Sequence, residues 1–182
     1  MKTTLRKKYI NIRNNMSEID VFNKSINIYN KLITNKLYIN CNEIFIYVSN
    51  FNEVDTSSII NKAWDDKKRV AVPKVCNNLI KFYYINSMQD LKKGKFNILE
   101  PTTLIEGIPT DNSLFIMPGI VFDKNRNRIG FGGGYYDKYL FSYPNIFKKV
   151  AICYDYQLID KIPTDIHDVR PDYIFTESQI IS

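Results

Sequence analysis

Glycine is scarce in this chain, with only 7 glycines among 182 residues. Four of the 7 are nevertheless gathered between positions 130 and 134, at Gly130, Gly132, Gly133 and Gly134. Glycine loses more conformational entropy on folding than any other residue, so a chain poor in glycine clusters it only where another residue would not fit. We therefore expect the backbone N–H groups of this segment to approach a ligand closely, at the positive end of a following helix, which is an arrangement suited to phosphate.

Histidine and cysteine are scarce too, and their scarcity excludes several kinds of site. His167 is the only histidine, which excludes a histidine-rich zinc site and leaves one residue as the base of any Ser-His or Cys-His pair. Cys41, Cys76 and Cys153 lie far apart, without Cys-x-x-Cys spacing. Because no secretory leader is evident and no apolar run is long enough to span a membrane, we expect reduced, buried thiols in a cytoplasmic protein.

The composition is that of an ordinary globular protein, with 45% hydrophobic and 24% charged residues. We interpret residues 1–182 as one domain, long enough to bury a core without disulfides or metal. The net charge of +6 fits nucleic acid, an acidic membrane surface or an anionic small molecule as partner, and it does not choose among them.

Apolar spacing predicts two helices between residue 3 and about residue 36, the second beginning at Ser17. Lys2, Arg6, Lys7 and Lys8 decorate the first helix. Taken alone, such charges are interpreted as a solvated face.

The rest of the chain alternates strands and helices. A strand at Glu43–Ser49, a helix at 57–66 capped by Asp55 or Thr56, and a strand at Arg69–Val75 form a βαβ unit. Further strands are expected at 79–85, 114–117, 150–154 and 173–176, with a turn of helix at 86–91 and a polar connection at 94–110. This pattern predicts a three-layer α/β fold with a mostly parallel sheet.

Such a sheet carries its site at the carboxyl ends of its strands, where polar residues stand in this chain. These residues are Glu53, Lys74, Asp123, Gln157 and the glycine loop. The loop is neither a Walker loop nor a dinucleotide fingerprint, because Tyr135, Tyr136 and Asp137 follow its last glycine.

A site built from these residue types would bind phosphate and magnesium. Arg128 with Lys2 or Arg6 would contact phosphate oxygens, and Asp137 or Asp168 would supply oxygen ligands to magnesium. Two adjacent tyrosines suggest a flat second substrate, and the Glu53 carboxylate could accept hydrogen bonds from the N–H groups along the edge of such a heterocycle. Each residue also has a purely structural interpretation. Asp137 would complement a helix N-terminus and Asp168 would cap a turn. The tyrosines would belong to the core, and Glu53 would be a loop charge.

At this point several segments resemble one known family. They are Ile46–Thr56, Val70–Lys74, Gly94–Pro101, Pro118–Asp123, Arg128–Leu140, Tyr154–Gln157, His167–Asp168 and Thr176–Glu177. Together, and in this order, they are similar to 5-formyltetrahydrofolate cyclo-ligase. The run Gly-Phe-Gly-Gly-Gly-Tyr-Tyr-Asp at 130–137 is the most specific of them.

The resemblance implies an ATP- and Mg²⁺-dependent conversion of 5-formyltetrahydrofolate to 5,10-methenyltetrahydrofolate, with release of ADP and phosphate. It also implies the α/β/α fold shared with sugar-phosphate isomerases and CoA transferases. The residues that it implies for ATP are Lys2, Thr3, Thr4, Leu5, Arg6, Arg128, Ile129, Gly130, Phe131, Gly132, Gly133, Gly134, Tyr135 and Tyr136. Those for folate are Val48, Glu53, Phe131, Gly132, Gly133, Gly134 and Tyr135. Arg128, Tyr136 and Asp137 would be catalytic, and Asp137 and Asp168 would serve the metal.

Two positions depart from the family's pattern. Arg126 replaces the usual glycine of the turn after Phe-Asp. The neighbouring Asn125 and Asn127 tolerate left-handed geometry, so we expect the turn to be rearranged rather than lost. Phe131 stands where Tyr or Arg is common.

We expect a monomer that acts on a small folate, with or without a polyglutamate tail, and that binds neither nucleic acid nor membrane. Two alternatives stay open: an enzyme of the same fold with another acceptor, and a basic nucleic-acid-binding protein.

Overall fold

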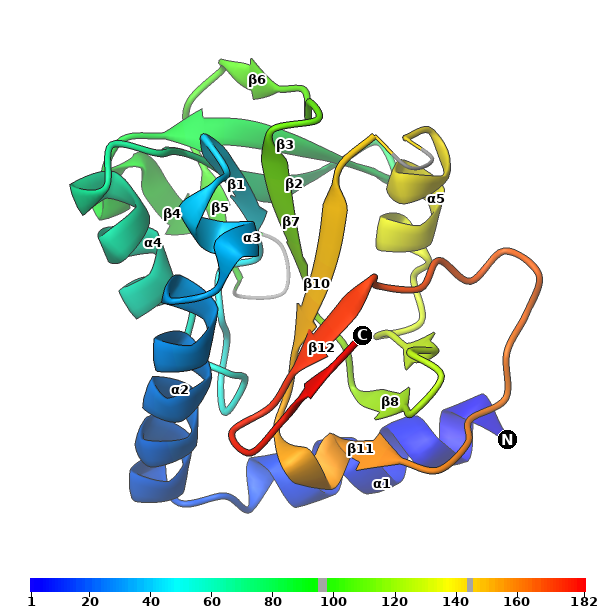
Figure 1. Cartoon of the computed structure of the whole chain (residues 1–182). Helices are drawn as coiled ribbons and strands as arrows, with labels where there is room; N and C mark the ends of the chain where they lie inside the picture. Colours follow the sequence, from blue (N-terminus) through cyan, green and yellow to red (C-terminus); the bar gives the residue numbers. More distant parts are fainter. Residues whose placement is uncertain (95–97, 144–145) are drawn as a thin grey trace.

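A central sheet of eight strands organises the molecule (Figure 1). The computed structural model describes residues 1–94, 98–143 and 146–182. The sheet strands are β1 (Glu43–Ile46), β2 (Arg69–Cys76), β3 (Leu79–Ile85), β6 (Glu106–Gly107), β7 (Ser113–Met117), β10 (Lys148–Ile152), β12 (Tyr173–Phe175) and β13 (Ile180–Ile181). Their order is β13-β12-β10-β7-β1-β2-β3-β6. The five strands from β12 to β2 pair in parallel, and antiparallel strands lie at both edges, which confirms a mostly parallel sheet.

Helices lie on both faces of this sheet. They are α1 (Lys2–Asn14), α2 (Glu18–Ile33), α3 (Lys36–Ile39), α4 (Ser57–Asp65) and α5 (Tyr135–Phe141), with 3₁₀ turns η1 (Met88–Asp90) and η3 (Asp155–Gln157). Ser17 caps α2 as predicted, because its side chain accepts a hydrogen bond from the N–H of Asp20. Within the described ranges, every helix is too short or too polar to cross a lipid bilayer.

The alternation of side chains along the central strands makes the three layers. Ile44 and Ile46 of β1 pack in the same cluster as α2 and α4, whereas Phe45 packs on the opposite face with Leu140 of α5. The neighbouring strands alternate in the same way, and all four residues of β1 are buried. Near-continuous apolar strands are expected where both faces of a parallel sheet are covered.

The helix α1 lies beside a second, small sheet that the sequence analysis did not predict. This sheet contains β8 (Val121–Asp123), β9 (Arg128–Ile129) and β11 (Leu158–Ile159), in the order β11-β8-β9. In Figure 1 it is seen with α1 beneath the central sheet. Strands of two or three residues are too short for hydrophobic alternation to reveal them.

Two predicted boundaries were wrong. The first strand ends at Ile46 rather than Ser49, and the connection expected at 94–110 contains β6 and β5 (Leu99–Pro101), which pairs with β4 (Leu91–Lys93). Residues 95–97 of that connection lie outside the described residues. Among the cysteines, Cys41 and Cys153 are buried and free as predicted, but Cys76 is only half-buried.

Capping of α4 is carried by Asp55 and not by Thr56. The Asp55 carboxylate accepts the N–H groups of Ser57 and Ser58, while the Thr56 side chain makes no capping hydrogen bond. Thr56 instead accepts the N–H of Ser49 at 2.9 Å and closes the loop after β1.

In the turn after β8, Arg126 itself takes the left-handed conformation, with a φ of +64°, and neither neighbouring asparagine does. The turn survives because Asp123, fully buried, accepts hydrogen bonds from the N–H groups of Asn125, Asn127 and Ile162.

We predict that Arg126→Gly raises the free energy of unfolding by about 0.5–1 kcal/mol. Relief of left-handed strain, about 1–2 kcal/mol, exceeds the added chain entropy of glycine. Urea denaturation measures the difference, and Asn125→Gly is the matched control, expected to lower stability because its φ is not left-handed. A lower midpoint for Arg126→Gly would contradict the prediction.

Candidate functional site

The glycine loop joins β9 to α5 and presents its backbone to solvent. Phe131, Gly132 and Gly133 are exposed, and the N–H groups of residues 131–134 donate no hydrogen bond to any described residue. Gly132 and Gly134 have φ values of +109° and +64°, which side chains other than glycine rarely adopt. The loop therefore offers a row of unused backbone donors, as an anion cradle requires.

The start of α1 is attached to this loop and to the segment before β12. Arg6 donates from Nε to the carbonyl of Gly130 at 2.8 Å. Lys2 Nζ lies 2.6 Å from both Asp165 and Asp168. The interpretation of Lys2 and Arg6 as a solvated face was wrong, although Lys7 and Lys8 are exposed. Arg6 and Lys2, two of the cations that the resemblance implies for ATP, thus contact the glycine loop and Asp168, respectively.

The other N-terminal residues implied for ATP divide into anchors and exposed positions. Leu5 packs on a cluster with Tyr9 and Ile129, so it holds α1 against the small sheet. Thr3 and Thr4 are exposed at the end of the helix.

Arg128 lies beneath the loop, with a side chain only 3% exposed. Its guanidinium donates to Asp137 Oδ1 at 2.6 Å and to the carbonyl of Pro118 at 3.3 Å. The N–H of Val169 reaches the same Asp137 oxygen at 3.1 Å. Arg128 therefore fixes Asp137, and its direct contact with a phosphate stays a prediction.

Asp137 and Asp168 have the free oxygen atoms that a magnesium ion would need. Asp137 Oδ2 and Asp168 Oδ1 accept no hydrogen bond from any described residue, and Val169, which contacts Asp137, follows Asp168 in the chain. The described part of the chain holds no group of three or more acidic, histidine or cysteine side chains suited to a metal. Two carboxylates fit magnesium when substrate phosphates complete its octahedral shell.

Glu53, the residue implied for folate, is nearly buried after β1. Its Oε1 lies 3.3 Å from Arg13 NH1, its Oε2 accepts the N–H of Asn50 at 2.9 Å, and its side chain is 10% exposed. Burial raises the pKa of Glu53, and the charge of Arg13 opposes that rise. Val48, also implied for folate, is buried in the segment between β1 and Glu53.

Tyr135 and Tyr136 are half-buried and contribute to the core. The Tyr136 ring meets Phe82 and Phe115 edge-on at 6.2 Å between centroids. Burial, with the charge of Glu53 as a smaller cause, raises the pKa of Tyr136, so its hydroxyl stays protonated. The plain interpretation of these tyrosines as core rings is therefore correct in part.

The other polar residues at the strand ends hold loops in place. Gln157 donates to the carbonyls of Gly119 and Ile120, and Lys74 donates to the carbonyl of Pro101 at 3.0 Å. Asp123 anchors the turn described above.

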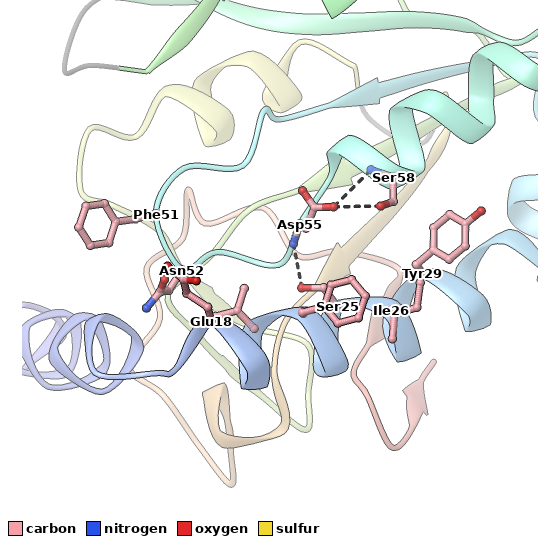
Figure 2. A pocket seen from close by; sticks show the side chains of 10 residues that line it. Glu18, Ser25, Ile26, Tyr29, Phe51, Asn52, Asp55 and Ser58 are labelled. Carbon is pink, nitrogen blue, oxygen red and sulfur yellow. Dashed lines mark hydrogen bonds between the residues drawn. The ribbon is translucent and has the colours of Figure 1, made fainter.

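A pocket of about 500 Å³ lies between α2 and the loop that precedes α4 (Figure 2). None of the site residues implied by the sequence lines it. Its lining residues are Glu18, Val21, Phe22, Ser25, Ile26, Tyr29, Phe51, Asn52, Asp55 and Ser58. Glu53 and Val54 line a different, narrow cavity with Arg13, so one loop contributes to two separate spaces.

Arg13 and Asn52 are residues of this region that sequence reasoning missed. Arg13 is 8% exposed, and Asn52 donates its side-chain N–H groups to the carbonyls of Arg13 and Met16. A signal for Arg13 was present, because Arg6 and Arg13 stand seven positions apart and share one face of a helix.

Comparison with known proteins identifies relatives along nearly the whole chain. Residues 1–177 match the model of the 5-formyltetrahydrofolate cyclo-ligase family. The chain is 32% identical over 169 residues to the mitochondrial 5-formyltetrahydrofolate cyclo-ligase of Arabidopsis thaliana, covering 78% of this chain and only 61% of that protein. It is 33% identical over 133 residues to 5-formyltetrahydrofolate cyclo-ligase of Haemophilus influenzae, with 69% and 71% covered.

A solved structure agrees with the fold. The chain superimposes on 5,10-methenyltetrahydrofolate synthetase of Aquifex aeolicus with a TM-score of 0.88 and 30% identity, covering 98% of this chain and 91% of that one. The α/β fold expected from the sequence is thereby confirmed.

We predict that Gly134→Ala lowers the free energy of unfolding by about 1–2 kcal/mol, because alanine must then hold a left-handed conformation. A Cβ at this position would meet no atom within 4 Å, so the loss reports backbone strain alone. Gly134→Asn is the matched variant, and we expect a smaller loss because asparagine tolerates this conformation. Equal losses in urea denaturation would show that φ is not the constraint.

Proposed function

The chain belongs to the 5-formyltetrahydrofolate cyclo-ligase family, and we propose that it converts 5-formyltetrahydrofolate to 5,10-methenyltetrahydrofolate with consumption of ATP. The observation that carries the proposal is the family match over residues 1–177, which includes the glycine loop and the residues gathered around it. Residues 1–182 would act as one domain, as a monomer in the cytoplasm, as the sequence predicts.

The glycine loop would hold the triphosphate of ATP. The unused N–H groups of residues 131–134 support this role; Arg6 adds positive charge at Gly130, and Lys2 adds it at Asp165 and Asp168. Although burial opposes it, hydrogen bonds to Asp165 and Asp168 raise the pKa of Lys2, so this side chain is charged at neutral pH. Phosphoryl transfer requires positioning and charge neutralisation, which this set of residues can supply.

Asp137 and Asp168 would hold the magnesium ion together with the phosphates. When bound, the ion supplies neutralisation of the charge that develops on the phosphate oxygens. Arg128 would keep Asp137 in place through the 2.6 Å contact, together with the N–H of Val169, which donates to the same carboxylate oxygen.

The folate would lie between Glu53 and the glycine loop. An ionised Glu53 can accept two N–H bonds from the edge of a pteridine, and Tyr135 with the exposed Phe131 offers aromatic surface for its ring. Val48 would contribute an apolar contact after β1.

The reaction then needs no protein nucleophile. The formyl oxygen attacks the γ-phosphoryl group, and the bond from that phosphorus to the β-phosphate oxygen breaks to release ADP. N10 attacks the activated formyl carbon and gives up its proton, and the carbon–oxygen bond breaks to release phosphate, which can carry that proton away. The protein would hold two anionic substrates in line and keep water away, which accounts for large rate accelerations.

We predict that the protein, mixed with MgATP and 5-formyltetrahydrofolate, produces the absorbance of 5,10-methenyltetrahydrofolate. Omission of MgATP should abolish the signal, because the formyl oxygen is a poor leaving group without phosphorylation. A folded protein that gives no product would reject the proposal. ADP release with another acceptor would support instead an enzyme of the same fold with a different substrate.

Two substitutions should separate the two binding regions in calorimetric titrations. We expect Arg6→Gln to weaken ATP binding about tenfold and Glu53→Gln to weaken folate binding by a similar factor, since each removes a charge-assisted contact. Each variant should keep its affinity for the other ligand. Lys7→Gln removes one charge from the exposed face of α1 and serves as control. Unchanged affinities in Arg6→Gln and Glu53→Gln would remove both residues from the site.

A further inference from the structure

Arg13 connects two parts of the site that are far apart in the sequence. Its NH1 group lies 3.3 Å from Glu53 Oε1, and its guanidinium carbon lies 5.4 Å from the centre of the Phe131 ring. Glu53 belongs to the loop after β1, and Phe131 belongs to the glycine loop. One side chain of α1 therefore contacts both the residue proposed to read the pteridine edge and the loop proposed to hold ATP.

Arg13 is largely shielded from solvent, and its guanidinium is only partly hydrogen-bonded. The residue is 8% exposed, and its Nε is buried without a hydrogen-bond partner among the described residues. Arg13 and Glu53 line a narrow cavity with Tyr47, Gln157 and the Pro118-Gly119 segment. A buried guanidinium that uses one of its donors on a single carboxylate oxygen is costly for stability alone, because desolvation offsets much of the ion-pair energy.

Two hydrogen bonds between side chains and backbone carbonyls hold α1 against the loops that contain Phe131 and Glu53. Arg6 binds the carbonyl of Gly130 two turns before Arg13, on the same face of the helix. Asn52, next to Glu53, donates to the carbonyl of Arg13. The distance between Arg13 and Glu53 is thus constrained by these two hydrogen bonds as well as by the ion pair.

The charged and titratable groups around Glu53 come from four elements. Burial raises the pKa of Glu53, and the charge of Arg13 of α1 and the N–H of Asn50 oppose that rise. The charge of Glu53 acts on Tyr47 after β1, Tyr136 of α5 and Tyr154 after β10, and the Tyr154 hydroxyl donates to the Glu53 backbone carbonyl at 3.0 Å. Burial raises the pKa of each tyrosine, to about 12 for Tyr154, so all three stay neutral near pH 7.

We propose that Arg13 is a positioning residue that fixes Glu53 and Phe131 relative to each other and thereby determines the affinity for the folate substrate. The inference rests on the proposed function, since it takes Glu53 and Phe131 as folate contacts. Arg13 acts through these two residues and takes no part in the transfer of the phosphoryl group. Loss of its charge leaves Glu53 buried without a cation, so the ionised, accepting form persists only at higher pH.

Steady-state kinetics of Arg13→Gln tests this directly. We expect the KM for 5-formyltetrahydrofolate to rise about tenfold and the KM for ATP to change much less, because the charge-assisted contact that is lost is the one with Glu53, on the folate side. The acid limb of kcat/KM should move to higher pH. Arg13→Lys keeps the charge without the planar group, and it should restore the position of the acid limb and part of the affinity.

Three comparisons decide the outcome. Lys7→Gln, which removes one charge from the same helix at an exposed position, should behave as wild type. In combination with Glu53→Gln, Arg13→Gln should add less than its separate effect on the folate KM, since both act on one contact. An unchanged folate KM, an equal rise in both KM values, or full additivity would overturn the inference. Thermal melting identifies a variant that fails to fold. If Arg13→Gln does not fold, a wild-type folate KM in Arg13→Lys would overturn the inference.

A measurement without substrate separates this inference from the proposed function. The Glu53 carboxyl is titrated by carbon NMR in wild type and in Arg13→Gln, and the inference expects a higher pKa in the variant. An absence of product from wild type would reject the proposed function. A Glu53 pKa that does not rise would reject the role of Arg13 even in an active enzyme.

Discussion

The attachment of α1 across the carboxyl ends of the sheet strands is the constraint on which the candidate site depends. Lys2, Arg6 and Arg13 each contact a different loop: the segment at 165–168, the glycine loop and the loop after β1. These loops come from distant parts of the sequence, and the sheet alone does not fix their separations. Three cations on one rigid helix do so, because a helix advances by a constant 1.5 Å per residue.

The sheet supplies a platform that can bear this arrangement. Its central strands are buried on both faces, so loops at their ends are carried by the most stable part of the molecule. The polar residues that end these strands then divide into two groups. Asp123, Gln157 and Lys74 satisfy backbone groups of the loops, whereas Glu53, Asp137 and Asp168 each pair with a cation, Arg13, Arg128 and Lys2 respectively. Both groups are needed, since an unsupported loop would let the second group drift.

The sequence was sufficient for the features that arise from periodicity. The helices α1, α2 and α4 and the central strands were predictable because apolar residues recur at regular spacing over several residues. The small sheet was not, because its strands have two or three residues and depend on Asp123, whose role as a buried acceptor is set by tertiary contacts. The sequence could not assign the left-handed φ to Arg126 for a similar reason: the neighbouring asparagines have the higher local preference, but the hydrogen bonds to Asp123 hold the turn with Arg126 in that conformation.

One contact also constrains how the protein is made. Lys2 pairs with Asp168 across a separation of 166 positions, so α1 is synthesised long before the segment that contains its partner. Closing so long a loop carries a high entropic cost, which only the assembled sheet between the two segments can offset. A chain interrupted before residue 168 would therefore carry an incomplete candidate site, and the site could assemble only after that residue has been synthesised.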